Sequence, residues 1–155
     1  MGTEIERKFL VDTARWTPRD AGTRFVQGYL CADPTRVVRV RREGDRAKLT
    51  IKGATSGITR TELEYDIPVD DAELMLATMC EPPLVEKTRY CEDHGGTRWE
   101  IDVFHGENAG LVLAEVELPS EDAPFVRPAW ATTEVSHDPR YYNANLAKRP
   151  FRRWT

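Results

Sequence analysis

Apolar and polar residues alternate along most of this chain, a pattern typical of β-strands with one apolar and one polar face. Successive side chains of a strand point to opposite sides, so residues two apart project together. Segments with this alternation lie at Glu4–Val11, Arg24–Leu30, Arg36–Arg42, Arg46–Gly53, Arg60–Ile67, Leu84–Cys91, Arg98–Phe104 and Leu111–Leu118. The pattern therefore predicts eight strands.

Short turns that contain glycine connect several of the predicted strands. Glu43–Asp45 joins the third strand to the fourth, Asp93–Gly96 the sixth to the seventh, and Gly106–Gly110 the seventh to the eighth. Parallel strands need crossovers of a dozen or more residues, so links this short indicate antiparallel hairpins. We therefore expect an antiparallel sheet.

Helices are expected at two places. Asp70 or Asp71 could cap a helix that ends before Pro82, and Asp138 could start a second helix that runs through Lys148. The order is strands, one helix, more strands and a helical tail, which is typical of an α+β or β-barrel fold, mainly β. The chain contains neither a GxGxxG sequence nor a Walker loop, which argues against a Rossmann-like fold.

Length and composition fit one globular domain that spans residues 1–155. The chain has 22 Lys and Arg against 26 Asp and Glu, a net charge of −4, and 31% of its residues are charged. This share exceeds the usual level of about 25%, so the fold must accommodate more charged side chains than a typical domain. The net negative charge argues against nucleic acid as a partner.

We expect a cytoplasmic protein without a membrane segment. The chain has no stretch near the roughly 20 apolar residues that cross a bilayer, and its first ten residues lack the apolar core of a secretory signal. The cysteines, Cys31, Cys80 and Cys91, are odd in number and lack the spacing of metal ligands, which favours free thiols in a reducing compartment. The oligomeric state stays open.

Much of the charge lies on the polar faces of the predicted strands, and most faces carry one sign. The acids are Glu4, Glu6, Glu62, Glu64, Glu100, Asp102, Glu115 and Glu117, and the bases are Lys8, Arg39, Arg41, Lys48, Lys52, Lys87 and Arg89. Either these faces are wetted by solvent, as on many antiparallel sheets, or they converge inside a closed barrel.

The separation of signs favours convergence, because a solvated face usually mixes charges so that like charges do not lie opposite one another. An eight-stranded barrel has an interior just wide enough for side chains or one small ligand. Charges buried there would need water, counter-ions and a charged ligand. Carboxylates suit Mg²⁺ or Mn²⁺, whereas Arg and Lys suit phosphate oxygens, so both sets together indicate a metal–polyphosphate site.

The same residues resemble a known family. Glu4-Ile5-Glu6-Arg7-Lys8 matches the N-terminal ExExK signature of the CYTH, or triphosphate tunnel metalloenzyme, superfamily. Further elements follow in the order of the family, including Val38–Arg41, Lys48–Gly53, Lys87–Arg89 and Ala114–Leu118. The resemblance covers nearly the whole chain. It implies an eight-stranded antiparallel β-barrel with a few covering helices, whose tunnel binds a triphosphate and a divalent metal.

The resemblance also implies roles for the charged residues. The metal ligands would be Glu4, Glu6, Glu115 and Glu117, and the metal Mg²⁺ or Mn²⁺. The substrate-binding residues would be Lys8, Tyr29, Arg39, Arg41, Lys52, Lys87 and Arg89. The catalytic residues would be Glu62, Glu64, Glu100 and Asp102, which would hold a second metal or position the attacking water, together with Lys8. Arg7 is expected on the outer surface in an ion pair.

The implied activity is metal-dependent hydrolysis of a small-molecule triphosphate. We expect inorganic tripolyphosphate, cleaved to diphosphate and orthophosphate, because no segment of the chain is identifiable as a nucleoside-recognition element. The alternatives are an adenylate cyclase of the class IV type, a nucleoside or thiamine triphosphatase, and a polyphosphate-binding module without efficient catalysis. The acidic set argues against the module, because anion binding alone gains nothing from so many carboxylates.

Overall fold

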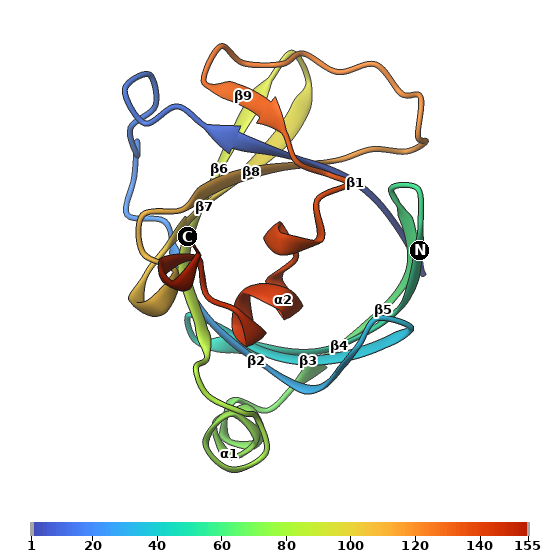
Figure 1. The fold of residues 1–155 in the computed structure, drawn as a ribbon, viewed down its shortest axis with the longest axis vertical. Coiled ribbons are helices and arrows are strands. Elements are labelled where there is room, and N and C mark those ends of the chain that lie inside the picture. The colour runs from blue at the N-terminus through green and yellow to red at the C-terminus, as the bar shows by residue number, and fades with distance from the viewer. Residues whose placement is uncertain (1, 155) are drawn as a thin grey trace.

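The computed structural model describes residues 2–154, and its dominant feature is a closed ring of eight antiparallel strands (Figure 1). The neighbours in the ring follow the order β1-β5-β4-β3-β2-β6-β7-β8, and β8 pairs with β1. All eight predicted strands are present, with ends that shift by up to three residues. They are β1 (Thr3–Val11), β2 (Thr23–Asp33), β3 (Arg36–Glu43), β4 (Arg46–Ser56), β5 (Thr59–Ile67), β6 (Val85–His94), β7 (Thr97–Phe104) and β8 (Val112–Glu117).

The ring closes through a short contact between β1 and β5. Three residue pairs join these strands, from Thr3–Thr61 to Ile5–Thr59. Further along, β1 pairs instead with a ninth strand, β9 (Ala131–Glu134), which lies outside the ring (Figure 1). The sequence pattern did not predict β9, because a strand of four residues is too short for alternation to reveal.

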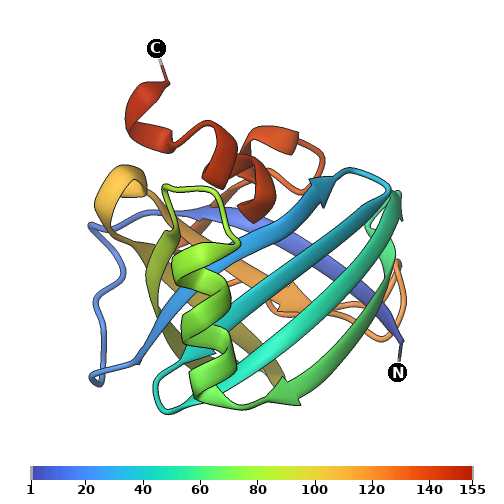
Figure 2. The ribbon, with the colours of Figure 1, turned by 90° about the horizontal axis from the view of Figure 1, so that it is seen from below.

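Helix α1 (Val69–Thr78) lies over the outer face of β2, β3 and β4 (Figure 2). Its end before Pro82 is as predicted, but its N-cap is Pro68, and Asp70 and Asp71 lie in the first turn. The predicted capping role of the two aspartates is therefore wrong. Carboxylates in the first turn still interact favourably with the positive end of the helix dipole, which explains an acidic pair at a helix start.

The predicted C-terminal helix is divided into two short elements. Asp138 accepts a hydrogen bond from the Arg140 N–H and caps only a 3₁₀ turn, Pro139–Tyr141. Tyr142 is extended, with φ −68° and ψ 133°, and helix α2 (Asn143–Lys148) follows it. The expectation of one continuous helix is therefore wrong. The break redirects the tail so that it crosses one end of the barrel (Figure 2).

The outward apolar faces of the barrel are covered by different elements on its two sides. Ala72 and Leu76 of α1 pack against Val40 and Ala47 on one side. The other side, formed by β1, β7 and β8, is covered by β9 and irregular segments rather than by helices. The cluster on this side includes Phe9, Trp16, Trp99, Ile101, Val116 and Trp130.

An apolar layer closes one end of the barrel interior. Val85, Phe104 and Leu113 stand at positions that alternate into the barrel, and they pack with Tyr141 and Leu146 from the tail. The barrel interior is thus apolar where the tail covers it, and the charged residues lie deeper along the same strands.

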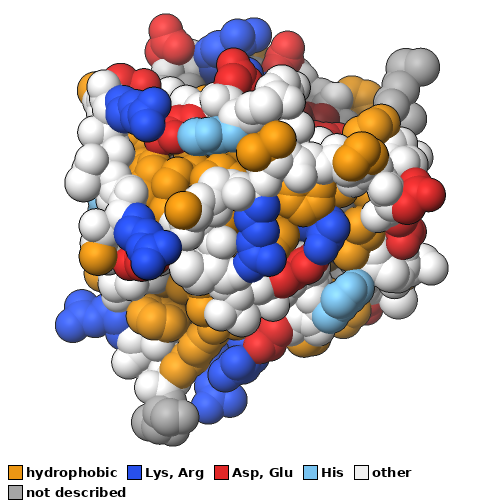
Figure 3. Space-filling model, turned by 90° about the horizontal axis from the view of Figure 1, so that it is seen from above, with side chains coloured by type: hydrophobic (Ala, Val, Ile, Leu, Met, Phe, Trp, Pro, Cys, Tyr) orange, Lys and Arg blue, Asp and Glu red, His pale blue; other side chains and the backbone are white. Residues whose placement is uncertain are grey.

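The outer surface mixes charges of both signs with apolar side chains on the face that carries β9 (Figure 3). Within residues 2–154, no helix is long and apolar enough to cross a membrane. The expected location in the cytoplasm stays a prediction. Cys31, Cys80 and Cys91 are free thiols, as predicted.

Candidate functional site

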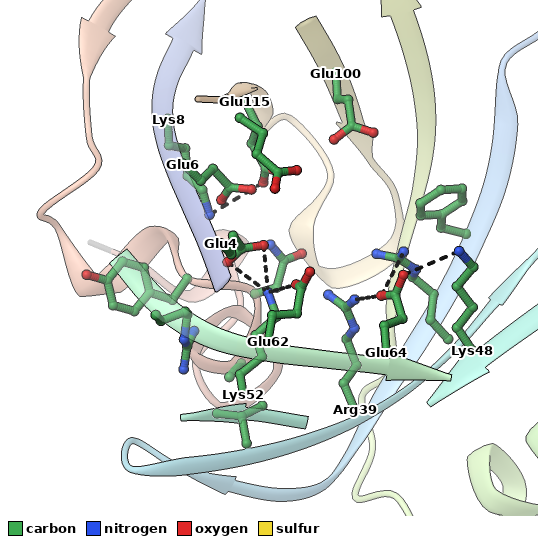
Figure 4. Close-up of a pocket in the computed structure, with 18 of the residues that line it drawn as sticks. Glu4, Glu6, Lys8, Arg39, Lys48, Lys52, Glu62, Glu64, Glu100 and Glu115 are labelled. Carbon is green, nitrogen blue, oxygen red and sulfur yellow. Dashed lines mark hydrogen bonds and ion pairs between the residues drawn. The ribbon is translucent and has the colours of Figure 1, made fainter. Parts of the chain in front are cut away.

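A cavity of about 1040 Å³ lies inside the barrel and is lined by side chains from all eight strands of the ring and from the tail. Almost every predicted site residue lines it, and Figure 4 shows several of them pointing toward one another. The converging residues are Glu4, Glu6, Lys8, Tyr29, Arg39, Arg41, Lys52, Glu62, Glu64, Lys87, Arg89, Glu100, Glu115 and Glu117, with Lys48. The charged faces therefore converge, and the alternative of solvent-wetted outer faces is excluded.

Arg7 shows the opposite orientation, as its position in the alternation predicts. Its guanidinium donates to both carboxylate oxygens of Glu134, at 2.9 and 2.6 Å, on the outside of the barrel. This contact lowers the pKa of Glu134 to about 2. The prediction of an outer ion pair for Arg7 is confirmed.

Carboxylates from β1 and β8 meet on one wall of the cavity. Glu6 pairs across the strands with Glu117, and Lys8 pairs with Glu115. Enclosure in the barrel, followed by the negative charges of Glu115 and Glu4, raises the pKa of Glu6 well above its ordinary value. The ionised form of Glu6 is thus electrostatically unfavourable in the protein alone, and a bound cation would stabilise it.

The acids of this wall fit a metal ion by their chemistry. Among residues 2–154, no three acidic, histidine or cysteine side chains are already arranged to hold a metal. Lysines act as the counter-charges instead: Lys52 Nζ lies 3.4 Å from Glu4 Oε1, and Lys8 Nζ lies 3.6 Å from Glu115 Oε1. A set of oxygen ligands suits a hard divalent cation, and a bound cation would replace these lysine contacts.

Arg39 and Arg41 of β3 both line the cavity, and Figure 4 shows the guanidinium of Arg39 directed toward Glu64. Arg39 Nη2 donates to Thr50 and lies 3.5 Å from the carboxylate of Glu64. Arg41 Nε donates to Glu43 at 2.7 Å. Burial, followed by the positive charges of Arg39 and Arg89, lowers the pKa of Arg41 to about 10. Arg39, Arg41 and Arg89 thus form a cationic wall in which like charges lie close together, and a bound polyanion would stabilise them.

Asp102 on β7 lies opposite Arg89 and is completely buried. Arg89 donates to both of its oxygens, at 2.8 and 2.9 Å, and Lys87 Nζ lies 2.9 Å from Oδ2. Although burial opposes ionisation, Arg89 and Lys87 hold the pKa of Asp102 well below its ordinary value. Burial lowers the pKa of Lys87 to about 8, with the positive charges of Arg89 and Arg41 acting in the same direction. Asp102 therefore contacts the basic residues, not the open cavity.

The remaining acids differ in their surroundings. Glu62 is partly buried beside Glu4, and burial together with this neighbour raises its pKa to about 7. Glu64 accepts a hydrogen bond from Thr50 Oγ1 at 2.8 Å, and this bond and the nearby arginines outweigh burial and lower its pKa. Glu100 accepts from Arg89 at 3.2 Å. With its pKa at about 7, Glu62 is an acid whose protonation changes near neutral pH.

Among the residues in or beside the cavity that the sequence did not single out are Phe25, Gln27 and Asn143. Phe25 and Gln27 precede Tyr29 on β2 with the same alternation, so that pattern could have found them. Gln27 Nε2 donates to Tyr29 Oη at 2.9 Å, and Asn143 Oδ1 accepts from Lys87 Nζ at 3.0 Å. No local pattern could have found Asn143, because its place depends on how the tail folds over the barrel.

Comparisons with known proteins agree with this architecture. A family model described as CYTH domain matches residues 2–150. An inorganic triphosphatase of Acetivibrio thermocellus is 47% identical over 152 residues, which cover 98% of this chain and 97% of that protein. An inorganic triphosphatase of Nitrosomonas europaea is 42% identical over 149 residues, covering 94% of this chain and 97% of that protein. A crystal structure of an inorganic triphosphatase matches with a TM-score of 0.67 and 38% identity over 95% of each chain. Because both the family model and these relatives span nearly the whole chain, the protein belongs to the CYTH domain family.

Proposed function

We propose that the protein hydrolyses inorganic tripolyphosphate to diphosphate and orthophosphate in a reaction that depends on a divalent metal. The observation that carries this proposal is one cavity inside the barrel in which carboxylates from β1 and β8 lie across from basic residues of β3 and β6. The two similar proteins named inorganic triphosphatase support it.

The basic residues bind and align the phosphates. Phosphoryl transfer has a loose transition state, so the protein contributes mainly alignment and charge stabilisation. The guanidinium groups suit bidentate contacts with phosphate oxygens, and the lysines add point charges. We assign this role to Lys8, Arg39, Arg41, Lys52, Lys87 and Arg89, with Tyr29 as a further donor at the cavity wall.

The carboxylates on the opposite wall bind the metal. Glu4, Glu6, Glu115 and Glu117 are the proposed ligands, because they come from two paired strands and supply only oxygen donors. When bound, Mg²⁺ or Mn²⁺ would neutralise phosphate charge and so make the phosphorus more open to attack. Its binding would release Lys8 and Lys52 from Glu115 and Glu4 for contacts with phosphate.

We assign Glu62 the role of accepting a proton from the attacking water, because it lines the cavity beside the proposed metal ligand Glu4 and lies 3.3 Å from Lys52 Nζ. In the protein without metal its pKa is about 7, which is in the range where a carboxylate can act as a general base. Glu64 and Glu100 hold Arg39 and Arg89 from the cavity side. In this proposal Asp102 contributes to catalysis only by fixing Arg89 and Lys87.

A product assay tests the proposed function. The purified protein is incubated with Mg²⁺ or Mn²⁺ and tripolyphosphate, ATP or thiamine triphosphate, and the products are separated by ion chromatography. Equal amounts of diphosphate and orthophosphate from tripolyphosphate, lost on addition of a chelator, are expected. Formation of cyclic AMP from ATP, or tight binding of tripolyphosphate without turnover, would contradict the proposal.

Nucleoside triphosphates are the second candidate substrates, because the cavity is large. Its volume of about 1040 Å³ slightly exceeds the range of roughly 300–1,000 Å³ found for small-molecule sites. The ratio of kcat/KM for tripolyphosphate to that for ATP in the same assay decides between them.

A further inference from the structure

Phe25 is a buried aromatic residue inside a cavity whose wall is otherwise mostly polar. It is 5% exposed and lines the cavity from β2, where Thr23 and Tyr29 face the same way. Most other buried apolar residues of the barrel lie in clusters on the outer faces or in the layer that closes one end, although the smaller Val37 also lines the cavity. A ring at this place therefore needs an explanation other than membership of a core.

The ring of Phe25 lies against two guanidinium groups from strands that do not touch each other. The guanidinium carbon of Arg41 is 4.7 Å from the ring centroid, and that of Arg89 is 4.8 Å from it. Arg41 comes from β3 and Arg89 from β6, and β2 pairs with both strands. One residue on β2 can therefore contact both arginines at once.

The contacts of these arginines act in two different directions. Glu43 accepts from the Nε edge of Arg41, and Asp102 accepts from the Nε edge of Arg89, so each carboxylate lies near the plane of its guanidinium group. An aromatic ring attracts a cation through its face, at distances up to about 6 Å, without accepting a proton or carrying a negative charge. Edge and face contacts together restrict both the position and the tilt of each guanidinium group.

We propose that Phe25 is a positioning residue that orders Arg41 and Arg89 for binding of the triphosphate. The ring keeps two like charges apart and oriented, and it adds no negative charge that would compete with the phosphates. This role rests on the proposed function, since it assumes that both arginines bind substrate phosphates.

Substitution of Phe25 tests the proposal. F25L removes the aromatic face, F25M does so with a flexible side chain if F25L does not fold, and F25Y retains the ring. KM and kcat for tripolyphosphate are measured with Mg²⁺, and Kd for tripolyphosphate is measured by calorimetry with a chelator present. We expect KM and the metal-free Kd of F25L to rise about tenfold, equivalent to about 1.4 kcal/mol, with kcat within about twofold. F25Y is expected to stay within about twofold of the wild type in all three quantities.

F9L is the matched control. Phe9 is fully buried on β1 and has the guanidinium of Arg127 at 4.6 Å from its ring, but it faces the outside of the barrel. F9L is expected to lower the temperature of unfolding and to leave KM and Kd unchanged. Unchanged KM and Kd in F25L, an equal loss of affinity in F25Y, or an equal loss in F9L would each overturn the role of Phe25. If the wild-type protein binds tripolyphosphate without cleaving it, the proposed function fails, and the Kd series still decides the role of Phe25.

Discussion

Asp102→Asn changes the most deeply buried ion cluster of the protein while keeping nearly the same volume. In the wild type, the two carboxylate oxygens of Asp102 receive contacts at 2.8 to 2.9 Å from Arg89 and Lys87. Asp102 is 0% exposed and Lys87 is 1% exposed, so water cannot reach the remaining cations to solvate them. The substitution leaves two buried cations without their main counter-charge.

The magnitude follows from this burial. Removal of one partner from a buried ion pair costs about 3–5 kcal/mol, because the other charge stays buried and uncompensated. Arg89 keeps Glu100 at 3.2 Å and Glu115 at 3.7 Å, so we expect the lower end, about 3 kcal/mol in the free energy of unfolding. The pKa of Asp102 is lowered in the folded state, so its contribution is complete at pH 7 and is lost only as the pH falls through the acidic range.

Urea unfolding at pH 7, followed by circular dichroism and tryptophan fluorescence, measures this difference. Glu134→Gln is the matched control, since Glu134 also binds one guanidinium through both oxygens, in its pair with Arg7. Both side chains of that pair are 30% exposed, so E134Q is expected to cost about 1 kcal/mol or less. A loss below about 1 kcal/mol in D102N, or equal losses in the two variants, would refute the idea that burial makes the Asp102 cluster important.

Three further predictions concern the cavity. Glu6→Gln should abolish turnover at saturating metal, with the urea midpoint unchanged or raised because the ionised form of Glu6 is unfavourable in the fold; normal turnover would contradict its assignment as a ligand. Arg41→Ala should raise KM for tripolyphosphate about tenfold or more with a smaller change in kcat, and an unchanged KM would remove Arg41 from the substrate-binding set. KM should rise above about pH 8, because the pKa of Lys87 is about 8 and its deprotonation removes a cation from the site; a pH–KM profile that is flat to about pH 9 would exclude this role.

The local pattern of the chain was sufficient to predict the strands and the direction of their side chains. Alternation placed Glu4, Glu6 and Lys8 on the face opposite Arg7, and the structure has them inside and outside the barrel respectively. This succeeds because the period of two is a property of the extended backbone itself. The first residue of a helix was harder to predict. An acidic residue near the start of a helix can be its N-cap or can lie in its first turn, as Asp70 does.

Asp102 illustrates what the alternation leaves undetermined. Its position on the strand correctly predicted that its side chain points into the barrel. The same position did not show that the carboxylate would be fully buried. The pairing of β7 with β6 places Arg89 directly opposite Asp102, and both Arg89 and Lys87 contact its carboxylate. The burial of a carboxylate and its ion-pair partners depend on the register between neighbouring strands and on the side chains of those neighbours. The sequence of one strand does not contain this information.

The sequence by itself determined the eight strands, the antiparallel hairpins at the short turns and the charged face of each strand, because these follow from local periodicity and turn length. The tertiary structure alone decided that β1 meets β5 to close the ring, that β9 joins β1, and that the tail covers one end through Leu146 and Asn143. It also decided which charges neutralise one another. These features arise from contacts between residues far apart in the chain, and their stability depends on burial that no local pattern records.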